Sequence, residues 1–72
     1  MNIEMNADLM ESMVQDWLAD NSPEMDDLIL DREPYFSEEL NEWQQEAHDE
    51  KHDYLLVARD GYIRLDYVGT RL

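Results

Sequence analysis

The sequence predicts an α+β fold of three short helices followed by a C-terminal antiparallel β-hairpin that packs against them. Apolar residues recur at helical spacing between residues 9 and 18. Two more helix-start signals follow, at Ser22 and Ser37, and two strand-like runs flank Asp60-Gly61. We expect the 72 residues to form one domain over 1–72, with an acidic helical part at 6–53 and a hairpin at 54–68.

The first predicted helix begins after Asn6, a favourable N-cap residue, and has Asp8 in its first turn, where a negative charge suits the helix dipole. The segment Asn21-Ser22-Pro23 should end it. Its apolar face is a single stripe at the spacing i, i+1, i+4, i+5, i+8, i+9: Leu9, Met10, Met13, Val14, Trp17 and Leu18.

A second, short helix is predicted to start at Ser22, with Pro23 at its first position, and to stop before Arg32-Glu33-Pro34. It would offer Met25, Leu28 and Ile29 to the core.

A third helix is predicted to start at Ser37, with Glu38 and Glu39 in its first turn. Its apolar face is thin and consists of Leu40, Trp43 and Ala47.

The last segment has the alternation of a β-hairpin around Asp60-Gly61, a favoured pair for a two-residue type I′ turn. This turn sets the register Arg59–Tyr62, Ala58–Ile63, Val57–Arg64, Leu56–Leu65, Leu55–Asp66 and Tyr54–Tyr67. One face is then uniformly apolar and should meet the helices. The outer face is mixed, and its apolar members are Leu55, Val57, Tyr62 and Val68.

The charge is unevenly distributed. The chain has 19 acidic and 5 basic residues, a net charge of −14, and all of the excess lies in residues 1–53. Disordered acidic tails are poor in apolar residues, whereas 43% of this chain is hydrophobic, so we expect it to fold. It has no cysteine and no apolar run near membrane-spanning length, so we expect a cytoplasmic protein without membrane association.

On the third predicted helix, carboxylates at steps of three or four residues would form one stripe: Glu38, Glu42, Glu46, Asp49 and Asp53. Asp26, Asp27 and Asp31 would support it. Such a row resembles the regular charge of a nucleic-acid backbone, and a site lined with Lys and Arg could accept it. We therefore expect an inhibitor or modulator that occupies a basic, nucleic-acid-binding site on a target protein. Small size and extreme acidity are shared by DNA-mimic inhibitors from phages and mobile elements, such as anti-restriction or anti-CRISPR proteins.

Two alternatives remain open. A charged helix face can be merely solvated. The chain can instead be an adaptor, a subunit or an antitoxin- or immunity-like protein that binds a partner, or itself as a homodimer, through the outer face of the hairpin. Trp43 lies on a helix with little apolar face and is a candidate interface anchor.

The sequence offers little for catalysis. His48 and His52 are four residues apart, but the segment His-Asp-Glu-Lys-His lacks the order of a zinc-protease motif. With two glycines and no cysteine, neither a phosphate-binding loop nor a thiolate metal site is expected. The helices would repel phosphate, which argues against direct nucleic-acid binding. We expect no enzyme activity, no metal and no cofactor.

Overall fold

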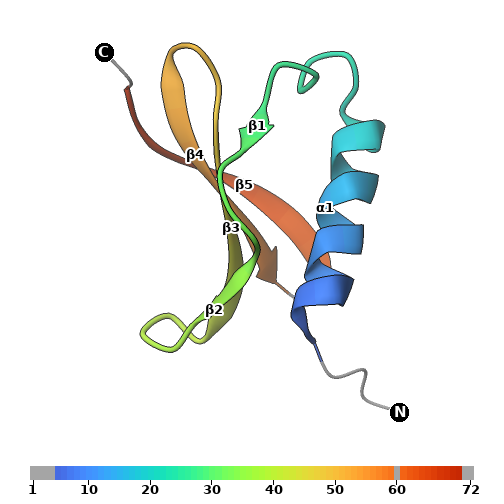
Figure 1. Cartoon of the computed structure of the whole chain (residues 1–72), viewed down its shortest axis with the longest axis vertical. Helices are drawn as coiled ribbons and strands as arrows, with labels where there is room; N and C mark the ends of the chain where they lie inside the picture. The colour runs from blue at the N-terminus through green and yellow to red at the C-terminus, as the bar shows by residue number, and fades with distance from the viewer. Residues whose placement is uncertain (1–4, 60, 71–72) are drawn as a thin grey trace.

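The computed structural model describes residues 5–59 and 61–70. In this part of the chain, one helix precedes an antiparallel sheet of five strands (Figure 1). The elements are α1 (Ala7–Asp20), β1 (Ile29–Leu30), β2 (Tyr35–Ser37), β3 (Glu42–His48), β4 (His52–Arg59) and β5 (Tyr62–Thr70). The predicted fold of three helices and a hairpin is therefore wrong, because two of those helices are replaced by strands and turns.

Helix α1 confirms the first predicted helix. The side-chain Oδ1 of Asn6 accepts a hydrogen bond from the Leu9 backbone N–H at 2.8 Å, as an N-cap does. At the other end, Asn21 donates its backbone N–H and its side-chain Nδ2 to the carbonyl of Trp17. The predicted stripe faces the sheet, and Met10 and Val14 are fully buried there.

The hairpin of β4 and β5 has the predicted register at all six pairs, from Arg59–Tyr62 to Tyr54–Tyr67. Gly61 has a φ of 86°, the left-handed conformation that the tight turn requires. The pairing continues beyond the predicted hairpin to His52–Thr70, past an irregularity at Asp53/Tyr54.

The second predicted helix is absent. Residues 21–27 form turns, in which the Ser22 hydroxyl donates to the Asp26 carboxylate at 2.8 Å. The chain then pairs twice with β3, first through β1 and again through β2. The sheet explains this outcome: a short segment gains more by completing the edge of β3 than by forming an isolated helix of two turns.

The buried side chain of Gln45, on β3, bonds to the backbone of the segment between β1 and β2. Its Nε2 donates to the backbone carbonyl of Arg32, in that segment, and to that of Glu46 at 2.9 Å. The backbone N–H of Asp31 also reaches the Glu46 carbonyl, at 2.9 Å. These bonds satisfy backbone groups where the ladder is interrupted.

The third predicted helix is also absent. Ser37 does accept a hydrogen bond from the Leu40 backbone N–H, but the chain turns back at Asn41, whose φ is 55°. Residues 38–41 thus form a hairpin loop, and Asn is one of the few residues that tolerate this conformation. In β3, alternate residues then face the helix: Trp43, Gln45 and Ala47.

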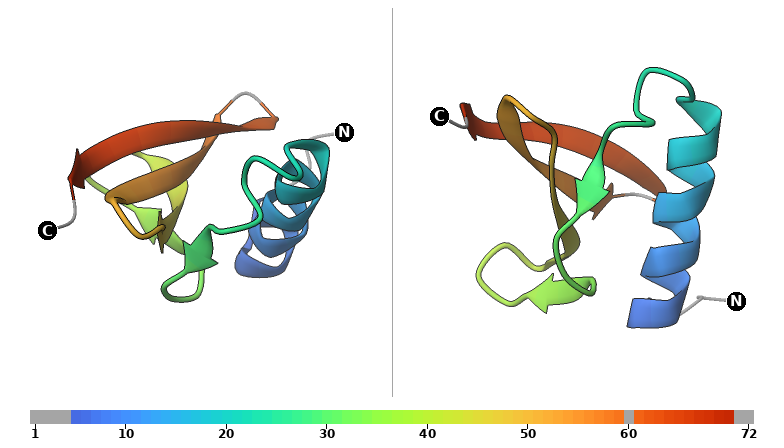
Figure 2. Two further views of the ribbon diagram at one scale, coloured as in Figure 1. Left: turned by 90° about the horizontal axis from the view of Figure 1, so that it is seen from above. Right: turned by 45° about the horizontal axis from the view of Figure 1, so that its top comes forward.

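Helix α1 covers one face of the sheet (Figure 2). The core between them contains the buried residues Met10, Val14, Leu56 and Ile63. The sheet runs in the order β1-β3-β4-β5. β1 and β2 pair with different parts of β3, and β5 is the edge strand on the other side of the sheet.

Candidate functional site: an acidic end of the sheet

The α1–β1 loop and the β3–β4 turn lie toward the same end of the molecule (Figure 1), and both are rich in carboxylates. The segments are held together by the pairing of Ile29 with His48. We call this region the acidic end. Its seven carboxylates belong to Glu24, Asp26, Asp27, Asp31, Asp49, Glu50 and Asp53.

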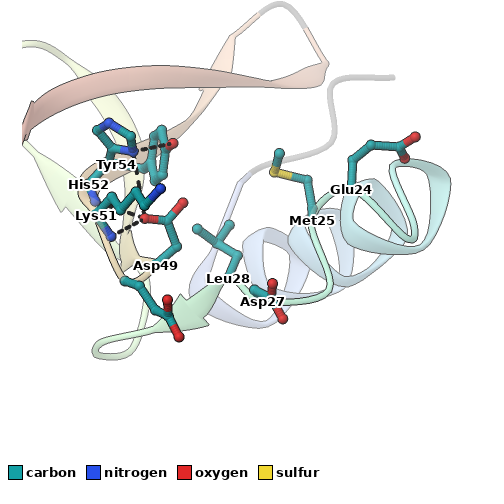
Figure 3. A pocket seen from close by; sticks show the side chains of 9 residues that line it. Glu24, Met25, Asp27, Leu28, Asp49, Lys51, His52 and Tyr54 are labelled. Carbon is teal, nitrogen blue, oxygen red and sulfur yellow. Dashed lines mark hydrogen bonds and ion pairs between the residues drawn. The ribbon is translucent and has the colours of Figure 1, made fainter.

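A shallow depression of about 310 Å³ lies within the acidic end. Glu24 and Asp27 line it from the α1–β1 loop, and Asp49 and Glu50 line it from the β3–β4 turn. Figure 3 shows the apolar side chain of Leu28 between these two groups. The depression is open to solvent and presents carboxylates around a small apolar floor.

Asp49 is held in place by the backbone of the β3–β4 turn. Its Oδ1 accepts hydrogen bonds from the backbone N–H groups of Lys51 and His52, both at 2.8 Å (Figure 3). The Lys51 bond is the main cause that lowers the pKa of the Asp49 carboxyl, and the His52 bond adds to it. Asp49 is therefore an oriented anion at neutral pH.

The two histidines contact different partners. His48 forms a hydrogen bond with Asp31, between Nδ1 and Oδ1. His52 has its Nδ1 3.7 Å from the Asp49 carboxylate and 3.3 Å from the Tyr54 hydroxyl, and its ring stands edge-on to Tyr67. Within residues 5–59 and 61–70, no group of three or more potential ligands is arranged to hold a metal ion.

The predicted five-carboxylate stripe does not exist, because its residues are not on a helix. Glu42 and Glu46 lie on the sheet face opposite α1, and each is paired with an arginine: Glu42 with Arg59 at 2.9 Å and Glu46 with Arg32 at 3.4 Å. Glu38 lies in the β2–β3 loop, at the other end of β3. Only Asp49 and Asp53 of the stripe belong to the acidic end.

The three supporting carboxylates are brought to this end by the loops. Asp26 and Asp27 lie in the α1–β1 loop and Asp31 follows β1, so five of the eight predicted carboxylates gather there. Sequence reasoning missed Glu24 and Glu50 as site residues. The segment Asp-Glu-Lys between the histidines was the available signal, since such polar residues are typical of a hairpin turn.

Trp43 is half-buried and lies away from the acidic end. It packs against the core, and its ring makes an edge-on contact with Phe36 at a centroid distance of 5.9 Å. Its role as an interface anchor stays a prediction. On the outer face of the hairpin, Val57 is buried, whereas Tyr62 and Val68 are exposed.

Comparisons of the chain with protein-family models, with curated protein sequences and with solved structures give no match. In the part of the chain that the structure describes, no helix is long and apolar enough to cross a membrane.

Proposed function

We propose that this protein binds, without catalysing a reaction, to a basic site on a partner protein, and that it does so through the acidic end. The observation that carries the proposal is that four carboxylates from two loops, Glu24, Asp27, Asp49 and Glu50, line one depression, in which Lys51 is the only lysine or arginine among the described lining residues. The partner site is one that otherwise holds nucleic acid, because Lys- and Arg-lined sites for phosphates also attract a compact group of carboxylates.

The local chemistry supports binding through charge. Asp49 is fixed by two backbone hydrogen bonds, so it loses little conformational freedom when a partner arginine or lysine approaches. Charge-assisted hydrogen bonds to guanidinium groups are stronger than neutral ones. The exposed Glu24, Asp27 and Glu50 line the same depression as this fixed anion. The negative field of the end would also accelerate encounter with a basic surface.

The acidic end differs from the acidic residues elsewhere on the sheet. Glu42 and Glu46 have arginine partners within the chain, so their charges are partly neutralised before any partner arrives. Among the described residues, the depression that these carboxylates line has no arginine, and its basic members are Lys51 and His52. This local excess is the reason to assign binding to the end and not to the outer face of the sheet.

The test is affinity capture with a triple variant of the acidic end, Glu24→Gln, Asp27→Asn and Glu50→Gln. Proteins captured from a host lysate by the native chain are identified, and duplex DNA is added as competitor. We expect the native chain to retain basic, nucleic-acid-binding proteins, DNA to displace them, and the triple variant to bind at least about tenfold more weakly.

The matched control is Glu11→Gln, Glu38→Gln and Glu39→Gln, which removes the same amount of charge at exposed positions outside the acidic end. It should bind like the native chain. Equal loss in both triple variants would show that total charge and not the acidic end is recognised. Binding that duplex DNA fails to displace would overturn the assignment of the partner site.

A further inference from the structure

Strand β5 is a long edge strand with an unpaired side. It spans nine residues, pairs with β4 on one side, and among the described residues meets no strand on the other (Figure 2). Three of its large side chains are well exposed: Tyr62 at 60%, Tyr67 at 58% and Val68 at 62%. Natural proteins usually shorten, cover or charge such an edge, because it offers free N–H and C=O groups to another strand.

The charge of the chain limits what can pair there. β5 contains one arginine, Arg64, and one carboxylate, Asp66, so it is neutral within a chain of net charge −14. Two copies of this protein repel each other through their acidic segments. At the neutral edge of β5, this repulsion opposes contact between two copies least.

The sequence of β5 is chemically symmetric about Leu65. An antiparallel pair of β5 strands centred on Leu65 would place Arg64 opposite Asp66 of the second copy, and Asp66 opposite Arg64. Within each copy Arg64 already donates two hydrogen bonds to Asp66, at 3.0 and 3.2 Å, so the four side chains would form one network of alternating charge. This register would also pair Ile63 with Tyr67, and it would bring Tyr62 near Val68, the residue of β5 that has no partner on β4 because of the register shift. Every pair is either oppositely charged or apolar, and such pairs stabilise a sheet.

The backbone phase agrees with this register. The two-residue turn closes on the pair Arg59–Tyr62, and hydrogen-bonded pairs alternate along an antiparallel ladder. Tyr62, Arg64 and Asp66 therefore direct their backbone groups to β4, whereas Ile63, Leu65 and Tyr67 direct theirs outward. Centring on Leu65 joins these outward groups with one another, and it places Arg64 and Asp66 of the two copies in the closer, non-hydrogen-bonded pairs.

From the edge, its neutrality and its symmetry we infer that the chain forms a two-fold symmetric dimer by antiparallel pairing of β5 with β5 of a second copy, centred on Leu65. The contact is isologous, and it joins the two sheets into one. This inference is independent of the proposed function of the acidic end.

The test measures molecular mass by light scattering and sedimentation equilibrium in about 0.5 M NaCl, where the Debye length is well below 10 Å and long-range repulsion is screened. The native chain should show twice its mass of 8.6 kDa. Arg64→Asp places two like-charged pairs across the interface, and so does Asp66→Arg. Each variant alone should dissociate at least about tenfold more readily.

An equimolar mixture of Arg64→Asp and Asp66→Arg should restore the dimer, because every cross-strand pair in the mixed species is again attractive. Circular dichroism checks that each variant folds. Lys51→Asp and Asp16→Arg match the two changes in charge at exposed positions outside β5, and they should stay dimeric. A native chain that remains monomeric at millimolar concentration overturns the inference, as does a mixture that gains no mass.

Discussion

Replacement of Gln45 by alanine distinguishes the observed strand β3 from the helix that the sequence predicts for this segment, because the two structures predict opposite changes in stability. Gln45 is 2% exposed, and its Nε2 donates to the carbonyls of Arg32 and Glu46. Loss of two hydrogen bonds at about 0.5–1.5 kcal/mol each, together with the cavity left behind, should lower the free energy of unfolding by about 2–4 kcal/mol. In an exposed helix position, alanine would instead stabilise slightly, by a few tenths of a kcal/mol.

Urea denaturation followed by tryptophan fluorescence measures this difference. The expected loss is a large part of the roughly 4–11 kcal/mol typical of a chain this long, and it corresponds to a fall in Tm of at least about 10 °C. Gln45→Met, which restores volume without the amide donor, should recover only part of the loss. Glu39→Ala, in the exposed β2–β3 loop, should change stability by less than about 0.5 kcal/mol. A Gln45→Ala variant as stable as this control would refute the bridging role of Gln45.

Three further predictions concern local structure. Asn6→Ala should cost about 1 kcal/mol of unfolding free energy in urea denaturation, and Asn6→Ser should keep most of it, because a hydroxyl also caps. Asn41→Val should cost about 1–2 kcal/mol, since a β-branched residue resists a φ of 55°, and Asn41→Gly should cost nothing. The native chain should have a higher free energy of unfolding than the Asp49→Asn variant. This difference should be largest above the ordinary carboxyl pKa of about 3.9, and it should disappear as pH falls through the lowered pKa of Asp49. A difference independent of pH between 7 and 2 would contradict this account.

The parts of the fold that the sequence predicted correctly are those specified by local chemistry. In α1, a cap at Asn6 and an uninterrupted apolar stripe agree with each other. In the β4–β5 hairpin, the sequence pair Asp60-Gly61 predicts a register that the structure matches at six pairs, although Asp60 itself lies outside the described residues. Where turn chemistry and periodicity favour the same local structure, the tertiary contacts need only be compatible with that structure.

The middle of the chain was predicted wrongly because its composition favours helix while its contacts favour strand. The residues of β3, Glu-Trp-Gln-Gln-Glu-Ala-His, include several good helix formers. The inward-facing residue Gln45 is polar, so the apolar residues of β3 do not show the alternation with a period of two that indicates a strand. The like charges at four-residue spacing were a warning, since Glu42 and Glu46 would repel each other on a helix but each meets an arginine on the sheet.

The candidate site was predicted in part, and by a route that the structure does not support. Five of the eight predicted carboxylates do lie together, but loops and the pairing of β1 with β3 bring them there, not a helix face. These contacts join residues far apart in the sequence, such as Asp31 with His48. A periodicity argument cannot find such contacts, because the strand pairing that creates them depends on the rest of the sheet.

The proposed dimer and the proposed binding site are compatible because of the direction in which β5 pairs. Thr70 lies opposite His52, beside the acidic end, and five residues from the dimer centre at Leu65. At about 3.3 Å per residue, the antiparallel arrangement places the two Thr70 residues about 33 Å apart, more than three Debye lengths at 0.1 M salt. A parallel pair would instead bring both acidic ends together and maximise their repulsion. Salt should therefore separate the two interactions: above about 0.1 M it should change the repulsion between the two acidic ends of the dimer little, because that repulsion is already screened, but it should weaken the attraction between the acidic end and a basic partner.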